Sequence, residues 1–209
     1  MRRLGFVSVV LALTACGSSG PSGQTGAAGG SGAAGTGGTP LAQTCDAYCA
    51  AIQTACTTSH QQYGDVETCK TSCAAFPTGA AADTSGDTLG CRIHFTVLAG
   101  ASAEAAATYC TKAGPGGDGA CGSNCDGYCD IVMMYCTAAN MAKIYDDRAA
   151  CMADCATHAT DATYTTGDPG RTDFGNEVAC ELYHAVMGSQ APGEHCPGDL
   201  ALTASTCRM

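Results

Sequence analysis

Apolar positions recur at helical spacing in two segments of the chain. Over residues 45–56 they fall at i, i+3, i+4, i+7 and i+11, one face of a helix, and residues 125–136 repeat this spacing. Thr44 and Asn124 precede the two segments as N-caps. We therefore predict two equivalent helices whose tyrosines pack in the core. The positions are Cys45, Tyr48, Cys49, Ile52 and Cys56, and then Cys125, Tyr128, Cys129, Val132 and Cys136.

A second helix is predicted in each segment, beginning near Asp65 or Asp147, two residues after a tyrosine. Its cysteines stand at i, i+4, as Cys69 with Cys73 and as Cys151 with Cys155. A third helix is expected from Gly86-Asp87 and from Gly175-Asn176, where a turn glycine precedes a capping side chain. The third helix has one cysteine, Cys91 or Cys180, and its apolar stripe is Leu89, Ile93 and Val97, or Val178, Leu182 and Val186.

The cysteines from residue 45 onward form two octets. Successive gaps are 3, 6, 12, 3, 17, 18 and 10 residues in the first octet and 3, 6, 14, 3, 24, 15 and 10 in the second, so four intervals are identical. This is an internal duplication. The fold predicted is all-α, with two tandem disulfide-stapled helical units at residues 44–121 and 122–209, each a twin C-x3-C helical hairpin plus a third helix.

The N-terminal residues 1–15 have the layout of a secretory signal, with Arg2 and Arg3 before an apolar run that is too short to span a bilayer. Leu13-Thr14-Ala15-Cys16 resembles the lipobox of bacterial lipoproteins. The resemblance implies cleavage before Cys16, lipidation of its sulfur with acyl chains such as palmitate, and anchoring in a membrane. Gly17, where aspartate would favour the inner membrane, implies the outer membrane.

The segment 16–43 is predicted to be a flexible tether. Glycine recurs at every third position from Gly17 to Gly38, which raises a collagen triple helix as an alternative. Only Pro21 and Pro40 are present, whereas a triple helix needs many imino acids. A Gly-rich coil of this length spans about 30 Å, which would hold the folded part away from the lipid.

A disulfide framework is the expected role of the cysteines, because an exported chain meets an oxidising compartment. Of seventeen cysteines, Cys16 is the odd one, and the other sixteen divide evenly. Each of the first two helices carries an i, i+4 pair of cysteines. If the helices form an antiparallel hairpin, the outer cysteine of one pair is predicted to form a disulfide with the outer cysteine of the other. The third helix offers the nearest partner for the last cysteine of the first helix, and the final two of each unit then pair. The predicted bridges are Cys45–Cys73, Cys49–Cys69, Cys56–Cys91, Cys110–Cys121, Cys125–Cys155, Cys129–Cys151, Cys136–Cys180 and Cys196–Cys207.

The twin C-x3-C hairpins are similar to those of the small mitochondrial intermembrane-space chaperones, over about 30 residues of each unit. The whole arrangement of lipobox, Gly-rich tether and duplicated cysteine-rich units resembles the uncharacterised cysteine-rich lipoproteins that are abundant in myxobacteria-like proteomes. That resemblance implies a location in the bacterial cell envelope and no activity.

Charge and motifs restrict the chemistry. The formal charge of −10 becomes about −12 without the signal, so nucleic acid is not an expected partner. No C-x2-C, H-E-x-x-H or G-x-S-x-G motif occurs, and His94 and His184 are not equivalent in the repeat. Asp126 and Asp130 are expected as solvated carboxylates. We therefore predict no catalytic residue, no metal site and no cofactor.

Recognition through a loop is the function that the duplication favours. The segment between Cys155 and Cys180 is seven residues longer than its counterpart. It carries exposed-looking residues that suit contact with an envelope or extracellular protein or a glycan, although it could simply connect helices. These residues are Tyr164, Asp168, Arg171 and Phe174. The alternatives are a redox or metal-handling periplasmic protein and an enzyme with an unrecognised site around His184 and Glu181.

Overall fold

The computed structural model describes part of the chain, and every described residue lies in the compact unit Thr39–Met209. The described residues are 40–140, 143–158, 163–164, 166 and 178–196. The fold is all-α, as predicted, and these residues include no strand. The signal, Cys16 and the tether fall outside the described residues.

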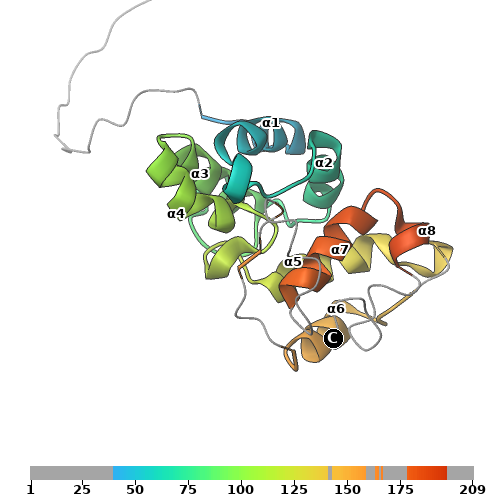
Figure 1. Cartoon of the computed structure of the whole chain (residues 1–209). Coiled ribbons are helices and arrows are strands. Elements are labelled where there is room, and N and C mark those ends of the chain that lie inside the picture. Colours follow the sequence, from blue (N-terminus) through green and yellow to red (C-terminus); the bar gives the residue numbers. More distant parts are fainter. Residues whose placement is uncertain (1–39, 141–142, 159–162, 165, 167–177, 197–209) are drawn as a thin grey trace, which may run out of the picture. The chain divides into compact units, whose positions relative to one another are not determined.

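Figure 1 shows the helices of the first repeat followed by those of the second. In the first repeat they are α1 Cys45–Ala55, η1 Thr58–His60, α2 Val66–Ala74, α3 Leu89–Ala99, α4 Ala103–Ala113 and η2 Gly117–Gly119. In the second they are α5 Asn124–Tyr135, η3 Ala138–Asn140, α6 Arg148–Cys155, α7 Val178–Gly188 and α8 Pro192–His195. The fourth helix of the first repeat, α4, was not predicted, and in the second repeat the short α8 follows α7 instead.

Side-chain caps fix where the helices begin. The Thr44 hydroxyl accepts from the Ala47 N–H, as predicted, and Asp65 and Asp147 cap α2 and α6 in the same way, where those helices were predicted to begin. Two predicted caps are wrong by one residue. Ser123, not Asn124, caps α5 in a reciprocal capping box with Asp126, and Thr88, not Asp87, caps α3. The predicted start at Gly175-Asn176 lies outside the described residues.

The two helical hairpins have the predicted bridges. Cys45–Cys73 and Cys49–Cys69 join α1 to α2, and Cys125–Cys155 and Cys129–Cys151 join α5 to α6. Cysteines one turn apart on each helix face the partner helix, so the outer pair and the inner pair close together. Seven of these eight cysteines are buried in the core, and Cys45 packs partly buried against it.

The other predicted pairings are wrong. Cys56 binds Cys110, Cys91 binds Cys121, and Cys136 binds Cys196, so Cys56–Cys91, Cys110–Cys121, Cys136–Cys180 and Cys196–Cys207 do not form. The physical reason is α4, which packs on α3 and carries Cys110 to the C-terminal end of α1. The N-terminal turn of α3 meets the loop after η2, where Cys121 lies. Cys180 is disulfide-bonded too, and the duplication predicts Cys207, outside the described residues, as its partner.

Each repeat has a tyrosine pair that packs in or against its core. Tyr48 and Tyr63 meet edge to face with their hydroxyls 2.9 Å apart, and Tyr128 and Tyr145 meet in the same way at 3.5 Å. Tyr48 and Tyr128 are fully buried, which confirms their core role. In the third helices Val178, Leu182 and Val186 are buried, whereas Val97 is 58 % exposed, so the predicted stripe of α3 ends at Ile93.

The two repeats touch through polar contacts between α2 and the second repeat. The Tyr135 hydroxyl donates to the Thr71 carbonyl oxygen at 2.7 Å, and the hydroxyls of Thr71 and Ser189 lie 2.6 Å apart. The Gln190 side-chain amide donates to the Thr68 hydroxyl at 2.8 Å. Figure 1 shows α2 next to α7, in agreement with these contacts.

Candidate functional site

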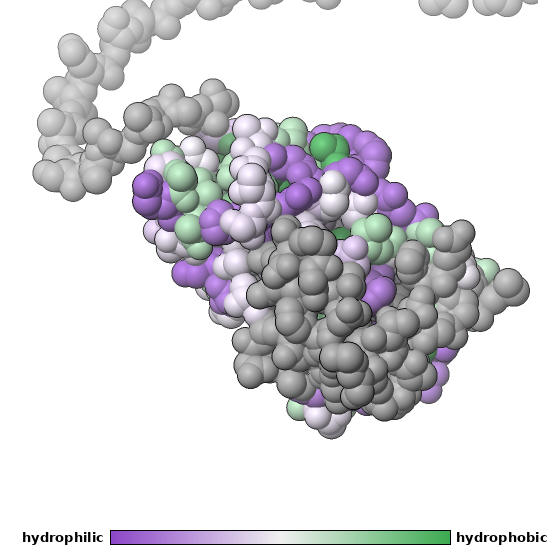
Figure 2. All heavy atoms as spheres, viewed as in Figure 1, coloured by the Kyte–Doolittle hydropathy of each residue, from purple (hydrophilic) through white to green (hydrophobic). Residues whose placement is uncertain are grey.

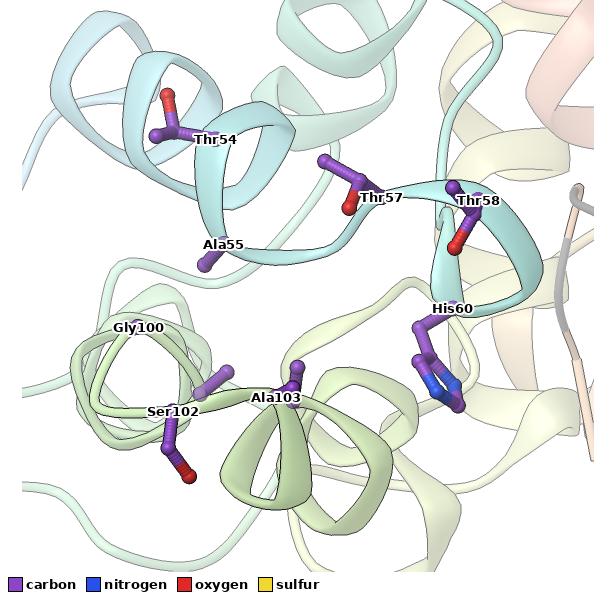
Figure 3. A pocket seen from close by; sticks show the side chains of 10 residues that line it. Thr54, Ala55, Thr57, Thr58, His60, Gly100, Ser102 and Ala103 are labelled. Atoms are coloured by element: carbon purple, nitrogen blue, oxygen red, sulfur yellow. The ribbon is translucent and has the colours of Figure 1, made fainter.

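A surface pocket of about 320 Å³ lies at the C-terminal end of α1 (Figure 3). One wall is formed by residues 54–60, and the other is formed by residues 99–106 at the corner between α3 and α4. The Cys56–Cys110 bridge ties the two walls together, because Cys110 lies on α4. The lining residues are Thr54, Ala55, Thr57, Thr58, His60, Ala99, Gly100, Ser102, Ala103 and Ala106.

Only some of the polar groups around the pocket are available for a ligand. The Thr54 hydroxyl donates to the Ala50 carbonyl oxygen at 2.9 Å, and the Ser102 hydroxyl accepts from the Ala105 N–H as the cap of α4. Thr57 stands at the N-cap of η1 without making a side-chain cap bond. In Figure 3 the hydroxyls of Thr57 and Thr58 point toward the gap that separates them from α4.

Thr58 has a strained backbone. Its φ is +54°, and among the described residues the other non-glycine residue with positive φ is Asp118. The left-handed region is unfavourable for a β-branched side chain. The equivalent residue of the second repeat, Ala138, also opens a short helix but has no positive φ. The repeat architecture therefore does not require the strain, and strain of this kind is concentrated at ligand-binding positions in proteins.

The second repeat has a pocket of about 310 Å³ at the corresponding end of α5. It shares the equivalent positions Thr137 and Ala138 with the first pocket, but its character differs. Its lining includes a thioether, a tyrosine ring and the Lys143 cation, none of which is found in the first pocket. The lining residues are Met133, Cys136, Thr137, Ala138, Lys143 and Tyr145.

A cluster of charged side chains joins the repeats on another part of the described structure. Arg148, the first residue of α6, donates to Asp130 at 2.6 Å, to Asp126 at 3.0 Å and to Asp87 of the first repeat at 3.3 Å. Arg92 lies 2.9 Å from Asp87 and is fully buried. The expectation of a solvated Asp130 is wrong, because its side chain is 6 % exposed.

The cluster shifts the pKa of its carboxyl groups in opposite directions. Burial, together with the nearby Asp87 carboxylate, raises the pKa of Asp130 to about 7, although Arg148 partly offsets this. For Asp126, burial is the largest single influence and would raise the pKa. Hydrogen bonds from Ser123 and the charge of Arg148 outweigh it and leave that pKa below its usual value. The two arginines of the cluster offset the negative charge of the three aspartates, and the cluster connects the two repeats.

Only part of the predicted binding loop belongs to the described residues. Asp168, Arg171 and Phe174 lie outside the described residues. Tyr164 is 3 % exposed, so the prediction that it is a surface contact is wrong. Its ring packs in the core, and burial raises the pKa of its hydroxyl well above the usual value. The backbone N–H of Thr166 donates to the Gln61 carbonyl oxygen of the first repeat, which holds the chain next to Tyr164 in place.

The described residues offer no metal centre or free thiol. No group of three or more histidine, cysteine or acidic side chains is placed there to hold an ion. Every cysteine from 45 to 196 is disulfide-bonded. Glu181 is buried and, with His184, lines neither of the two pockets. None of the described helices has both the length and the apolar character to cross a bilayer.

The exposed apolar side chains are scattered. On the face drawn in Figure 2, hydrophilic and hydrophobic residues alternate in small patches over the described part of the molecule. The exposed large apolar residues Val66, Val97 and Met134 stand on three different helices. Single exposed apolar residues need no partner to cover them, so these side chains mark no docking surface on the described part of the chain.

A protein-family comparison matches the first repeat. Residues 40–126 are similar to the family described as the BfoA family C-terminal domain, and this range is fewer than half of the 209 residues. The match contains the whole of the first cysteine octet and ends just after the first cysteine of the second. No curated protein and no solved structure matches the chain.

Proposed function

We propose that this protein is a lipid-anchored, non-catalytic binding module of a bacterial cell envelope, exported to the outer membrane. The observation that carries the proposal is the distribution of the seventeen cysteines. Those from residue 45 to 196 are bridged, which suits an oxidising compartment, and Cys16 stands apart from both octets in Leu13-Thr14-Ala15-Cys16.

The segment after Cys16 supports an anchored position. A glycine-rich coil from residue 16 to residue 43 would let the folded repeats move about 30 Å from the lipid headgroups. Multiple acyl chains on one cysteine stabilise attachment by about 0.8 kcal/mol per buried methylene, so the anchor would be durable. The negative formal charge of −10 favours neutral or basic envelope components over anionic surfaces.

The binding role is supported by the two repeats themselves. They share the cysteine framework, the tyrosine pairs and the pocket position, whereas the side chains that line the two pockets differ. A duplicated scaffold with divergent contact residues can hold two different ligands or one ligand with higher avidity. Neither pocket has an aspartate or glutamate among its lining residues, and this composition suits binding rather than hydrolysis.

The test is fractionation and lipid labelling of the full chain in a bacterium that processes lipoproteins. Wild-type protein should sediment with the outer membrane and incorporate an alkyne-tagged palmitate, whereas Cys16→Ala should be unlabelled and should leave the membrane fraction. Ser19→Ala, a matched change in the same glycine-rich segment, should behave as wild type. Equal labelling of wild type and Cys16→Ala, or a Cys16→Ala protein that still sediments, would contradict the proposal.

A further inference from the structure

The pocket at the end of α1 can be assigned a class of ligand. We propose that it binds one or two rings of a neutral glycan, an assignment that rests on the proposed binding role and names its substrate class. Its volume of about 320 Å³ is near the lower end of the range for small-molecule sites. A space of that size suits one or two sugar rings rather than a large ligand.

The lining chemistry selects a neutral, hydroxyl-bearing molecule. None of the ten lining residues is a lysine, arginine, aspartate or glutamate, so a charged ligand would lose hydration without gaining a counter-charge. The Thr57 and Thr58 hydroxyls can each donate and accept, as sugar hydroxyls do, and the His60 imidazole adds a further polar group.

Methyl groups on both walls suit the C–H face of a sugar ring. Ala55 and Ala103 present methyl groups across the gap in Figure 3, and Gly100 leaves the corner between α3 and α4 open. The Cys56–Cys110 bridge fixes the distance between the two walls. Walls held in place in this way reduce the ordering cost of binding, which helps a weak, hydrogen-bonding ligand.

A substitution at the strained Thr58 can distinguish a ligand-binding role of this residue from a purely structural role. Its φ of +54° would be relaxed in glycine, so Thr58→Gly should not lower thermal stability. If the residue only completes the fold, this change would have no other effect. If its hydroxyl contacts a sugar, the more relaxed variant should bind more weakly.

The experiment is a backbone-amide NMR titration of the full chain, purified in detergent, with maltotriose and chitotriose as neutral probes and trigalacturonate as an acidic comparator. At least one neutral probe should shift the amides of residues 54–60 and 99–106. Thr57→Val and Thr58→Gly should each weaken that binding about tenfold, as expected for the loss of one hydrogen bond. Thr108→Val, an exposed change elsewhere on α4, should bind as wild type.

Three results would overturn the assignment: no shift with either neutral probe at millimolar concentration, shifts confined to residues 133–145 of the second pocket, or tighter binding of trigalacturonate. Unchanged affinity in both Thr57→Val and Thr58→Gly would also overturn it. Because membrane anchoring is read from Cys16→Ala alone, a failed titration with a released Cys16→Ala protein would remove the glycan assignment and leave the anchor in place.

Discussion

Replacing Arg148 with methionine should destabilise the protein in a pH-dependent way. The change keeps an unbranched apolar stem but removes hydrogen bonds to Asp130, Asp126 and Asp87, whose side chains are 6 %, 24 % and 14 % exposed. Breaking a fully buried ion pair costs roughly 3–5 kcal/mol. Arg148 itself is 44 % exposed, and solvent screening reduces the cost.

The helix dipole also reduces the expected loss of stability. Arg148 is the first residue of α6, where the helix dipole disfavours a cation by about 0.3–1 kcal/mol, so its removal returns part of the loss. We therefore expect Arg148→Met to lower the free energy of unfolding by about 2 kcal/mol at pH 8. At pH 5 Asp130 is protonated in the folded protein, so the loss should be less than half as large.

The assay is urea unfolding of wild type and variant at both pH values, followed by far-UV circular dichroism. Lys143→Met is the matched control, since its ion pair with Asp146 is 48 % and 91 % exposed and should contribute under about 0.5 kcal/mol. A stabilising role of the Arg148 cluster is refuted if Arg148→Met lowers the free energy of unfolding no more than Lys143→Met at pH 8, or if the loss from Arg148→Met is equal at pH 5 and pH 8.

Two further predictions concern stability. The pKa of Asp130 is raised from 3.8 to about 7, so between these values the folded state holds a proton that the unfolded state has released, and stability from this group falls as pH rises. Asp130→Asn should therefore flatten the dependence of unfolding free energy on pH between about 4 and 7 in a series of urea titrations, and an unchanged slope would contradict this. Removing the Cys56–Cys110 bridge by a double change to alanine should cost about 4 kcal/mol in urea unfolding, from its sequence separation of 54, and a loss below about 1 kcal/mol would count against the bridge.

The helical hairpins could be predicted because their signals are local. Cysteines at i, i+4 and the caps Thr44, Asp65 and Asp147 act within one or two helical turns, so spacing alone gives the helices and their bridges. The helix α4 also has a local signal, since Ser102 precedes Glu104 and an alanine-rich run. Because α4 was not predicted, the partner predicted for Cys56 is wrong, since the true partner, Cys110, lies on α4.

The candidate site could not be predicted from the sequence in the same way. The pocket brings residues 54–60 against residues 99–106, and only the Cys56–Cys110 bridge and the packing of α4 place them together. Likewise, the sequence predicts an exposed carboxylate at Asp130, but in the fold this side chain is buried next to Asp87 of the other repeat. Tyr164 has no periodic neighbours that would indicate burial. Each of these features depends on contacts between distant segments.

The most direct measurement is a disulfide map of the mature, exported protein, because a duplicated cross-linked unit must form the same bridges in both repeats. Non-reducing proteolysis and mass spectrometry should yield peptides joined through Cys56–Cys110, Cys91–Cys121 and Cys136–Cys196, together with Cys180 joined to Cys207 and no free thiol. A Cys110–Cys121 peptide, or any bridge from residues 45–121 to residues 125–207, would contradict it.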